Sequence, residues 1–418
     1  MAVFTGKRRL RLVVAVTTCT ALIGVAPPAG AHPGPGWVGA WTAPVEAAAP
    51  DGFEGPNWSR EGFADQSVRQ VVRVSTGGSA LRLRVSNVYG AAPLRLAGAT
   101  VARSGHGAEL QPGSVRPVTF GSRVATTVAA GRSALTDPVH LPTRPLDRLT
   151  VTLYFAEPTG PATFHESAAT TTYRSAGDHR WDTGGSAYGE TTKSWYYLTG
   201  VDVSGAPRRD AVVAFGDSIT DSGGSTRGAD NRYPDELAER LVAAGVPLAV
   251  LNAGLSGNRV LNDSPCFGES ALDRFQRDVL DQVGVRTVIV MEGVNDLGYP
   301  TWDFPCFEPN DEFVTAQQLI EGYRALIRAA HAHGIRIIGG TVTPLGFFRT
   351  PDTEPVRIAV NEWIRTSGEY DAVVDFARIV ADPKDPSLLL SDYDPGDGLH
   401  PNDLGLKAMA DAIDLATL

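Results

Sequence analysis

The sequence predicts two folded regions of different class: an all-β sandwich, then a three-layer α/β/α domain with a parallel sheet. Two observations predict this division. Over residues 37–205, apolar and polar residues alternate with a period of two, which is typical of strands with one buried face. From residue 211, short apolar runs alternate instead with amphipathic segments, the pattern of parallel strands joined by helices. The 418 residues are enough for two domains with full cores.

Residues 1–31 are expected to be a signal peptide. A basic start at residues 7–11, an apolar stretch at 12–25 and the small residues Ala29-Gly30-Ala31 form its three parts, with the mature chain beginning near His32. The apolar stretch is too short to span a bilayer. The paired arginines in the basic start leave the twin-arginine route open beside general secretion. We therefore expect a secreted, extracellular protein with no stable membrane anchor.

The charge of the chain is unevenly distributed. The formal net charge is −10. Residues 32–205 carry 15 basic and 14 acidic side chains, whereas residues 206–418 carry 18 and 33. This near-neutral then acidic balance argues against nucleic acid as a partner and does not favour an anionic lipid surface. The histidines, cysteines and carboxylates show no metal-ligand spacing, so we expect no metal and no other cofactor.

The first region, residues 32–205, is predicted to be a sandwich resembling a jelly roll. In residues 81–85, leucine and valine alternate with arginine and serine, which predicts one buried and one wet face. Glycine, proline and asparagine turns separate further runs of this kind. These runs lie at 67–75, 116–120, 124–128, 149–155 and 194–198.

Aromatic residues of this region allow two interpretations. Trp181, Trp195, Tyr196 and Tyr197 would either stack on sugar rings or pack in the core. The core interpretation is favoured, because one side of a strand is normally buried. Carbohydrate binding by this region stays open.

The second region, residues 206–418, is predicted to be a doubly covered parallel sheet. An apolar stripe in residues 316–332 marks one amphipathic helix clearly. Short strands separated by such helices build a sheet with right-handed crossovers. The expected strands are 211–215, 248–252, 287–291, 336–339 and 372–375, and the expected helices are 235–244, 270–283, 316–332, 356–366 and 404–415.

Four polar blocks follow the expected strands or precede the last helix. They are Gly216-Asp217-Ser218, Gly254-Leu255-Ser256-Gly257-Asn258, Glu292-Gly293-Val294-Asn295-Asp296 and Asp397-Gly398-Leu399-His400-Pro401. Open α/β sheets bind their ligands outside the carboxyl ends of the strands. The blocks are therefore expected to meet at one edge of the sheet.

A serine and a histidine in these blocks suit nucleophilic catalysis. A serine hydroxyl is a weak nucleophile until a neighbouring base removes its proton, so Ser218 needs a base such as His400. His331 and His333 lie at the end of a helix, where a cation complements the dipole, and this explains them without catalysis. An acidic group near His400 would then orient its ring.

With these four blocks in order, residues 208–418 resemble the SGNH hydrolases, also called GDSL esterases and lipases. Ile219 stands where the name of the family has leucine. The resemblance implies a flavodoxin-like α/β/α fold and a catalytic triad of Ser218, Asp397 and His400, with Asp397 preferred over Asp392 and Asp394 by its spacing. It also implies an oxyanion hole formed by the Ser218 and Gly257 backbone N–H groups and the Asn295 side chain.

Two further features lie beside the blocks. Cys266 and Cys306 are expected to form a disulfide in an oxidising compartment, the alternative being two buried thiols. The disulfide would clamp two walls of the site. Trp302, Phe304 and Phe307 are expected to line the substrate pocket, unless they form a locally packed cluster. Phe347 and Phe348 are additional candidates for this pocket.

The prediction is a secreted serine esterase that acts through an acyl-enzyme on acetyl or short-chain esters, carbohydrate esters first. The architecture resembles secreted bacterial GDSL-like esterases and lipases with an N-terminal β-sandwich. A lipase or phospholipase for longer acyl chains is the first alternative, favoured by the aromatic loop. A glycan-binding protein with an ancillary hydrolase domain is the alternative from another class. The substrate would accordingly be a small-molecule, glycan or lipid ester, and the sequence does not indicate the oligomeric state.

Overall fold

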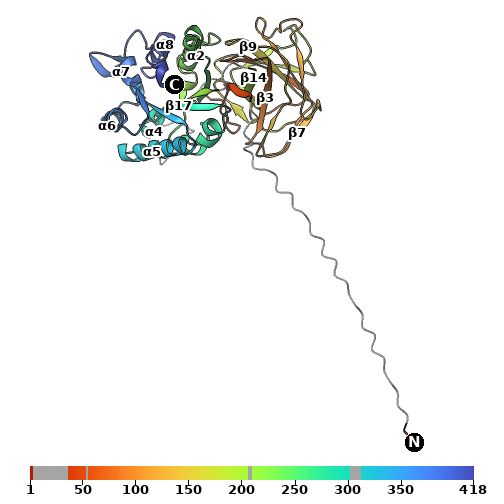
Figure 1. Cartoon of the computed structure of the whole chain (residues 1–418), viewed down its shortest axis with the longest axis horizontal. Coiled ribbons are helices and arrows are strands. Elements are labelled where there is room, and N and C mark those ends of the chain that lie inside the picture. Colours follow the sequence, from red (N-terminus) through yellow and green to blue (C-terminus); the bar gives the residue numbers. More distant parts are fainter. Residues whose placement is uncertain (3–35, 53–54, 206–209, 302–311) are drawn as a thin grey trace. The chain divides into compact units, whose positions relative to one another are not determined.

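The computed structural model describes residues 1–2, 36–52, 55–205, 210–301 and 312–418. The predicted signal peptide therefore lies almost wholly outside the described residues. Residues 33–418 form one compact unit, in which a strand-rich region precedes an α/β region (Figure 1). None of the helices in the described part of the chain is long and apolar enough to cross a membrane.

The strand-rich region contains two large antiparallel sheets, as the period of two predicts. The first has the order β1 (Trp37–Thr42), β14 (Leu198–Ser204), β3 (Ala80–Asn87), β8 (Arg132–Leu135). The second has the order β12 (Glu190–Thr192), β11 (Thr172–Ala176), β2 (Gln66–Arg73), β9 (Arg148–Phe155), β5 (Gly98–Arg103), β6 (Arg116–Val118). Two small pairs complete it: β4 (Leu94–Leu96) with β7 (Thr126–Val128), and β10 (Phe164–His165) with β13 (Trp195–Tyr196).

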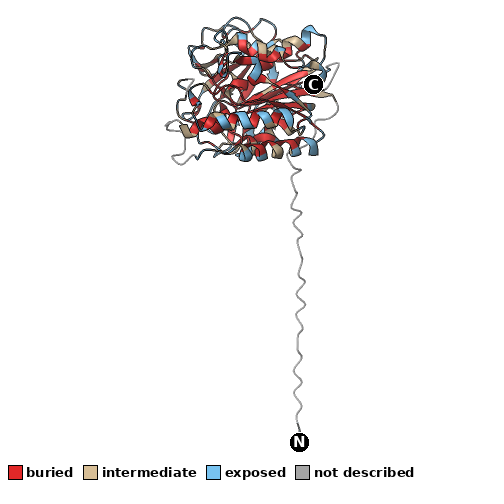
Figure 2. Ribbon diagram, turned by 90° about the vertical axis from the view of Figure 1, so that its left-hand side faces the viewer, coloured by how far each residue is buried: buried red, intermediate tan, exposed pale blue. Residues whose placement is uncertain are grey.

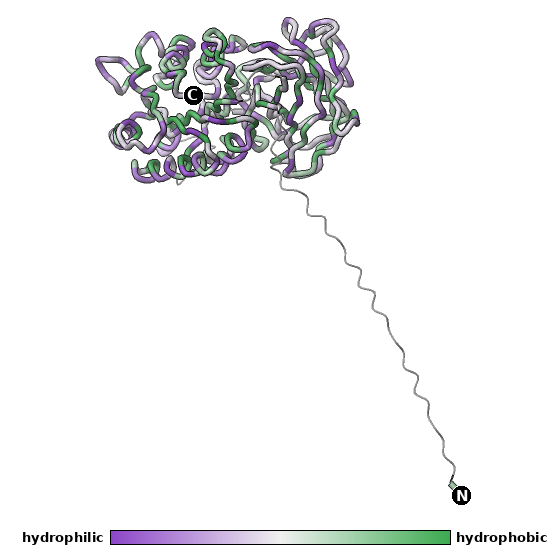
Figure 3. Tube along the Cα trace, viewed as in Figure 1, coloured by the Kyte–Doolittle hydropathy of each residue, from purple (hydrophilic) through white to green (hydrophobic). Residues whose placement is uncertain are grey.

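Side chains from both sheets meet in one apolar core, and Figure 3 shows apolar residues recurring along the strands. Trp195, Tyr196 and Tyr197 belong to this core, whereas Trp181 is 55% exposed. The core interpretation is therefore confirmed for Trp195, Tyr196 and Tyr197, which are too deeply buried to stack on a sugar. The face of β3 that carries Arg82 and Arg84 was expected to be exposed to solvent, and this expectation is wrong. Arg82 is buried and paired with Asp202, and Arg84 donates to Gln282 of the α/β region at 3.3 Å, because this face lies against that region.

The α/β region is built on a five-stranded parallel sheet. Its order is β16 (Ala249–Gly254), β15 (Ala211–Gly216), β17 (Val285–Met291), β18 (Arg336–Gly340), β19 (Ala372–Val374). Every residue of β15 is buried, as expected of a strand covered on both faces. The strand order reverses at β15, and such a switch point is where open sheets bind ligands.

Helices cover both faces of this sheet (Figure 1). On one face α2 (Tyr233–Ala243), α7 (Phe376–Val380) and α8 (Asp403–Asp411) pack together; on the other lie α3 (Ala271–Phe275), α5 (Ala316–Ala332) and α6 (Thr353–Thr366). Figure 2 shows that the helices turn buried faces inward and exposed faces to solvent. The short elements are α1 (Ser218–Asp221), η1 (Gln276–Leu280), α4 (Val294–Gly298), η2 (Tyr299–Thr301), η3 (Gly346–Phe348), β20 (Ala381–Asp382), β21 (Asp385–Leu389) and η4 (Leu415–Thr417).

The two regions share hydrogen bonds along β1 and β16. The Gly39 N–H donates to the Val283 carbonyl at 2.9 Å. The Ser75 hydroxyl donates to the Ala40 carbonyl at 2.9 Å and accepts from the Val250 N–H at 3.0 Å. Since these groups are buried, the strand-rich region is tied directly to an edge strand of the parallel sheet.

Candidate active site

Ser218 lies where β15 turns into α1. Asp217 is the N-cap of this helix, and its side chain accepts a hydrogen bond from the Ile219 N–H at 3.0 Å. The turn must begin at a glycine, because a Cβ on Gly216 would lie 2.2 Å from the Thr220 Oγ1 and 2.3 Å from the Met291 carbonyl oxygen. The serine hydroxyl is thereby placed at the carboxyl edge of the sheet.

Ser218, His400 and Asp397 form one hydrogen-bonded chain. The Ser218 Oγ lies 2.9 Å from the His400 Nε2, and the His400 Nδ1 lies 2.7 Å from the Asp397 Oδ2. The other carboxylate oxygen of Asp397 accepts from the backbone N–H groups of Leu399 and His400, at 2.8 and 2.9 Å. One carboxylate therefore fixes both the ring and the backbone of the histidine.

The charge of Asp397 decides which ring nitrogen of His400 is free to accept a proton. Burial alone would raise its pKa, but the hydrogen bonds from His400 and Leu399 and the charge of His400 lower the pKa to about 2. The ionised carboxylate accepts a hydrogen bond from the protonated Nδ1, so the unprotonated Nε2 faces the Ser218 hydroxyl as an acceptor. The arrangement has the parts of an activated nucleophile: a hydroxyl, a base and a group that orients the base.

A cavity of about 350 Å³ opens above this chain of residues. Gly257 and Asn295 line it together with the three residues already described, so all five predicted catalytic and oxyanion residues share one cavity. Its remaining lining residues are Glu166, Ser167, Ser222, Gly223, Gly224, Ser256, Tyr299, Phe347, Phe348 and Leu399.

Gly257 and Asn295 are held by specific contacts. Gly257 has φ +74°, and a Cβ there would lie 2.4 Å from the Phe267 Cγ. The Tyr299 hydroxyl donates to the Gly257 carbonyl. The Asn295 Nδ2 donates to the Asn258 carbonyl at 2.8 Å. An amide nitrogen carries two hydrogens, so Asn295 can hold this bond and donate a second one into the cavity.

Arg274, a residue that the sequence reasoning missed, ties the strand ends together beneath the site. It is fully buried, and it donates to the Gly216 carbonyl at 2.9 Å, the Ala253 carbonyl at 2.9 Å and the Asn258 Oδ1 at 2.7 Å. The carboxyl ends of β15 and β16 and the segment after Gly257 therefore share one donor. An arginine on the inward face of the predicted helix 270–283 is the only signal that the sequence contains.

Three carboxyl groups of the same sequence blocks, Asp217, Glu292 and Asp296, are buried, and the Glu292 Oε2 lies 3.7 Å from the Arg274 guanidinium. Burial raises the pKa of Asp217 to about 7 and that of Asp296 to about 6, and it raises the pKa of Glu292 well above its ordinary value. Asp296 accepts the Val260 and Leu261 N–H groups at 2.8 and 3.1 Å, so its work is structural. Asp217 and Asp296 therefore each hold a backbone segment beside the site.

Several predicted residues lie outside the described residues: Trp302, Phe304, Phe307 and Cys306. Their predicted roles, including the disulfide with Cys266, stay predictions. The additional candidates Phe347 and Phe348 do line the cavity, the first 50% and the second 3% exposed.

Glu166 and Ser167 are cavity residues that the sequence reasoning missed. They come from the strand-rich region, immediately after β10, and are buried at one wall of the cavity. No sequence signal could have found them, because the four blocks lie wholly in the other region. The cavity is therefore lined by both regions of the chain.

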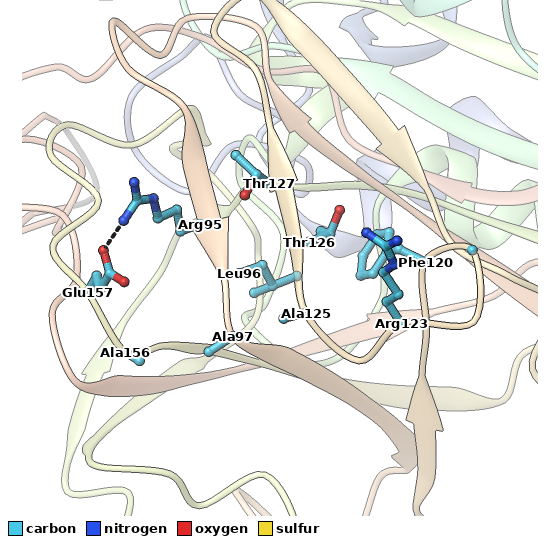
Figure 4. Close-up of a pocket in the computed structure, with 11 residues that line it drawn as sticks. Arg95, Leu96, Ala97, Phe120, Arg123, Ala125, Thr126, Thr127, Ala156 and Glu157 are labelled. Atoms are coloured by element: carbon cyan, nitrogen blue, oxygen red, sulfur yellow. Dashed lines mark hydrogen bonds and ion pairs between the residues drawn. The ribbon is translucent and has the colours of Figure 1, made fainter.

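A second hollow, of about 820 Å³, lies in the strand-rich region beside β4 and β7 (Figure 4). Arg95 and Glu157 form an exposed ion pair at 2.5 Å on its rim, and its other lining includes Arg123, Thr126 and Thr127. Although it is larger, it contains no serine or histidine, so it offers no activated nucleophile. Among the described residues, no group of three or more histidine, cysteine or acidic side chains is arranged to hold a metal ion.

The sequence model of the GDSL-like lipase/acylhydrolase family matches residues 214–408, which contain all five predicted catalytic and oxyanion residues. No curated protein matches the sequence of this chain.

Three solved bacterial structures are similar to about half of this chain. A lipase/acylhydrolase from Enterococcus faecalis is 21% identical, covering 49% of this chain and 92% of its own, with a TM-score of 0.37. A variant of an acetyl xylan esterase from Geobacillus stearothermophilus is 22% identical over 49% and 92%, with a TM-score of 0.37. A GDSL-like lipase from Bacteroides thetaiotaomicron is 18% identical over 50% and 87%, with a TM-score of 0.35.

Proposed function

We propose that the protein hydrolyses carboxylic esters through an acyl-enzyme on Ser218, and the match of residues 214–408 to the GDSL-like lipase/acylhydrolase family supports this. One observation carries the proposal: the hydrogen-bonded chain of Ser218, His400 and Asp397 opens into a cavity of about 350 Å³. Such a chain activates a serine hydroxyl that is otherwise a weak nucleophile.

In the acylation step the Ser218 Oγ attacks the ester carbonyl carbon while the His400 Nε2 takes the hydroxyl proton. The carbonyl oxygen becomes an oxyanion, for which the Ser218 and Gly257 N–H groups and the Asn295 amide are the proposed donors. Asp397, ionised throughout the neutral range, stabilises the imidazolium. When the intermediate collapses, the ester C–O bond breaks and His400 returns the proton to the leaving alcohol.

In the deacylation step a water molecule takes the place of the alcohol. His400 removes a proton from the water as its oxygen attacks the acyl carbon, and the same donors hold the second oxyanion. Collapse breaks the bond to the Ser218 Oγ and returns the proton to it, which releases the carboxylic acid and restores the enzyme.

The cavity favours short acyl groups on a hydroxyl-rich alcohol. Phe348 supplies an aromatic lining residue, and Ser167 and Ser222 are hydroxyl-bearing residues of the same lining. Serine hydroxyls both donate and accept hydrogen bonds, as the hydroxyls of a sugar do. We therefore place acetyl and other short-chain carbohydrate esters first and lipids second.

Hydrolysis of p-nitrophenyl acetate, butyrate and palmitate by the wild type and by Ser218→Ala tests the proposal. We expect kcat/KM to fall steeply from acetate to palmitate, and activity to vanish in the variant. A folded wild-type protein that hydrolyses none of these esters, or a fully active Ser218→Ala, would contradict the mechanism. A preference for palmitate would favour the lipase alternative.

Export also belongs to this proposal. The basic start, apolar stretch and small residues of 1–31 support it. Mass spectrometry of the protein from culture medium should give a mature N-terminus near His32. It should also find Cys266 and Cys306 in one disulfide-linked peptide. Retention of an intact N-terminus in the cytoplasm would contradict export, and alkylation of both thiols without reduction would contradict the disulfide.

A further inference from the structure

His165 is a buried residue of the strand-rich region that the proposed mechanism does not use. Its side chain is 2% exposed, and its Nδ1 lies 3.0 Å from the Pro44 carbonyl oxygen. Its Nε2 lies 3.0 Å from the Asp221 Oδ1 and 3.2 Å from the Ser167 carbonyl oxygen. Because all three partners are acceptors, the ring satisfies them only when both nitrogens carry a proton, as imidazolium.

Asp221 links this histidine to the site. It is the last residue of α1, the helix that begins at Ser218, and its side chain is 2% exposed. While its Oδ1 faces His165, its Oδ2 accepts from both the N–H of Ser256, at 3.0 Å, and the hydroxyl of Ser256, at 2.7 Å. One buried carboxylate therefore joins the strand-rich region to the residue that precedes Gly257.

The segment on both sides of Gly257 is fixed by such contacts. Ser256 is held by Asp221 on one side, and Asn258 is held by Arg274 on the other. The N–H of Gly257 itself is a proposed oxyanion donor, and such a donor acts only if its position is set before the charge develops. The Asp221 contact is the one restraint among these that depends on the strand-rich region.

We infer that His165 is a positioning residue for the reaction, which acts through Asp221 and Ser256 to hold the Gly257 N–H in place. The inference rests on the proposed function, because it needs Gly257 to be an oxyanion donor. By this inference, a residue of the strand-rich region contributes to the geometry of the active site. The residue acts at a distance and does not touch substrate.

The surrounding charges favour the imidazolium. Burial alone would lower the pKa of His165, but the charge and hydrogen bond of Asp221 and the Ser167 and Pro44 carbonyls raise it above its ordinary value. Glu46 is a further buried carboxyl group near Asp221. Burial and the neighbouring Glu166 raise the pKa of Glu46 well above its ordinary value, so the Glu46 carboxyl is neutral. Arg232 approaches Asp221 from α2, through a 3.5 Å contact with its backbone carbonyl.

The test compares His165→Gln with the matched control His331→Gln, using p-nitrophenyl acetate. His331 makes the same kind of pair, its Nε2 lying 3.0 Å from the Asp371 Oδ2, but on the surface and away from the cavity. We expect kcat of His165→Gln to fall about 10- to 100-fold with KM within about threefold, because a donor displaced by a fraction of an ångström loses its effect on the transition state. His331→Gln should match the wild type.

A double variant separates positioning from general stability. If His165 acts through Ser256, then His165→Gln combined with Ser256→Ala should lose less activity than the product of the two single losses. A histidine that merely stabilises the fold would give multiplicative losses. Unchanged kcat in a folded His165→Gln would overturn the inference. Where His165→Gln does not fold, Ser256→Ala decides alone: a lower kcat supports the inference and an unchanged kcat overturns it.

Failure of the proposed function would look different. A wild type without ester hydrolysis would contradict the proposed function, and nitrogen-15 NMR of the His165 ring then tests the pair independently of turnover. Two protonated ring nitrogens at pH 7 are expected. A neutral His165 ring at that pH would overturn the inference whatever the activity.

Discussion

Asp217 stands beside the nucleophile, yet it serves the helix rather than the reaction. Its carboxyl caps α1 through the Ile219 N–H and is buried, and burial raises its pKa to about 7. The folded state therefore holds the proton more tightly than the unfolded state does. Its contribution to stability is complete below the ordinary pKa of 3.8 and is lost as the pH rises through about 7.

Asp217→Asn should remove this pH dependence while keeping the cap, since the amide oxygen can also accept the Ile219 N–H. We expect the free energy of unfolding of the variant, relative to the wild type, to rise by up to ~4 kcal/mol between pH 4 and pH 8. Urea denaturation at both pH values measures it. An equal difference at both pH values would show that the carboxyl is not protonated in the folded protein.

Phe348 is the residue with which we test acyl length, because it is buried and lines the cavity. Phe348→Ala should enlarge the cavity and raise the kcat/KM ratio of hexanoate to acetate roughly tenfold, while stability falls by about 3 kcal/mol. The neighbouring Phe347→Ala is a control for stability only: Phe347 lines the same cavity, but it is half exposed and its truncation should cost little stability. An unchanged ratio in Phe348→Ala would place the acyl group elsewhere.

The sequence predicted single residues of the candidate site well only where they belong to a recognisable sequence motif. Ser218, His400 and Asp397 were predicted as a triad from their blocks, and the structure brings them within hydrogen-bonding distance. His165 and Glu166 carry no comparable signal. Their place beside the site depends on how one region packs on the other, and no local pattern expresses that.

The segment around Gly257 is the element that carries one donor of the proposed oxyanion site. Its glycine has φ +74°, and a Cβ would lie 2.4 Å from the Phe267 Cγ and 2.8 Å from the Tyr299 Oη. Backbone strain and steric exclusion therefore coincide at this position, directly beside a proposed catalytic donor.

Gly257→Ala should move this segment and lower kcat about 100-fold, the scale of losing one oxyanion donor. Gly245→Ala is a matched control: Gly245 has φ +67°, but a Cβ there meets nothing within 4 Å. Both variants should lose about 1 kcal/mol to left-handed backbone strain. Equal kcat values in the two variants, measured with p-nitrophenyl acetate, would remove Gly257 from the site.

Elements were predicted best where their own sequence determines them. The helix expected at 316–332 is α5, because a capping box at Thr315 and Gln318 and an apolar stripe define it locally. The helix expected at 270–283 is divided into α3 and the π-helical η1. The change of helix type follows directly after the buried Arg274 and its neighbour Phe275, and it leaves no period in the sequence.

At the scale of the molecule, the sequence predicted the fold class of each region, but it did not predict that the two regions pack against each other. Period-two and helical patterns report which face of an element is buried, without saying against what. Arg84 of β3 illustrates this, because it was expected in water and instead lies 3.3 Å from the Gln282 Oε1 of the α/β region. Two separately folding regions would have satisfied the same patterns.

The shared interface predicts that the two regions unfold together. Residues 33–418 form one compact unit, and the buried Ser75 hydroxyl bridges the Ala40 carbonyl and the Val250 N–H across it. Calorimetry should therefore show one transition, with equal calorimetric and van't Hoff enthalpies.

Ser75→Ala leaves the buried Val250 N–H without this partner, at a cost of about 1–3 kcal/mol, while the Ala40 carbonyl keeps the Ser75 backbone N–H at 2.8 Å. We expect the single transition to move down as a whole by a few degrees, with strand signal and esterase activity lost at the same temperature. A transition that divides in two, with the activity following only one half, would mean that the regions fold independently and that the contact between His165 and Asp221 joins two separate domains.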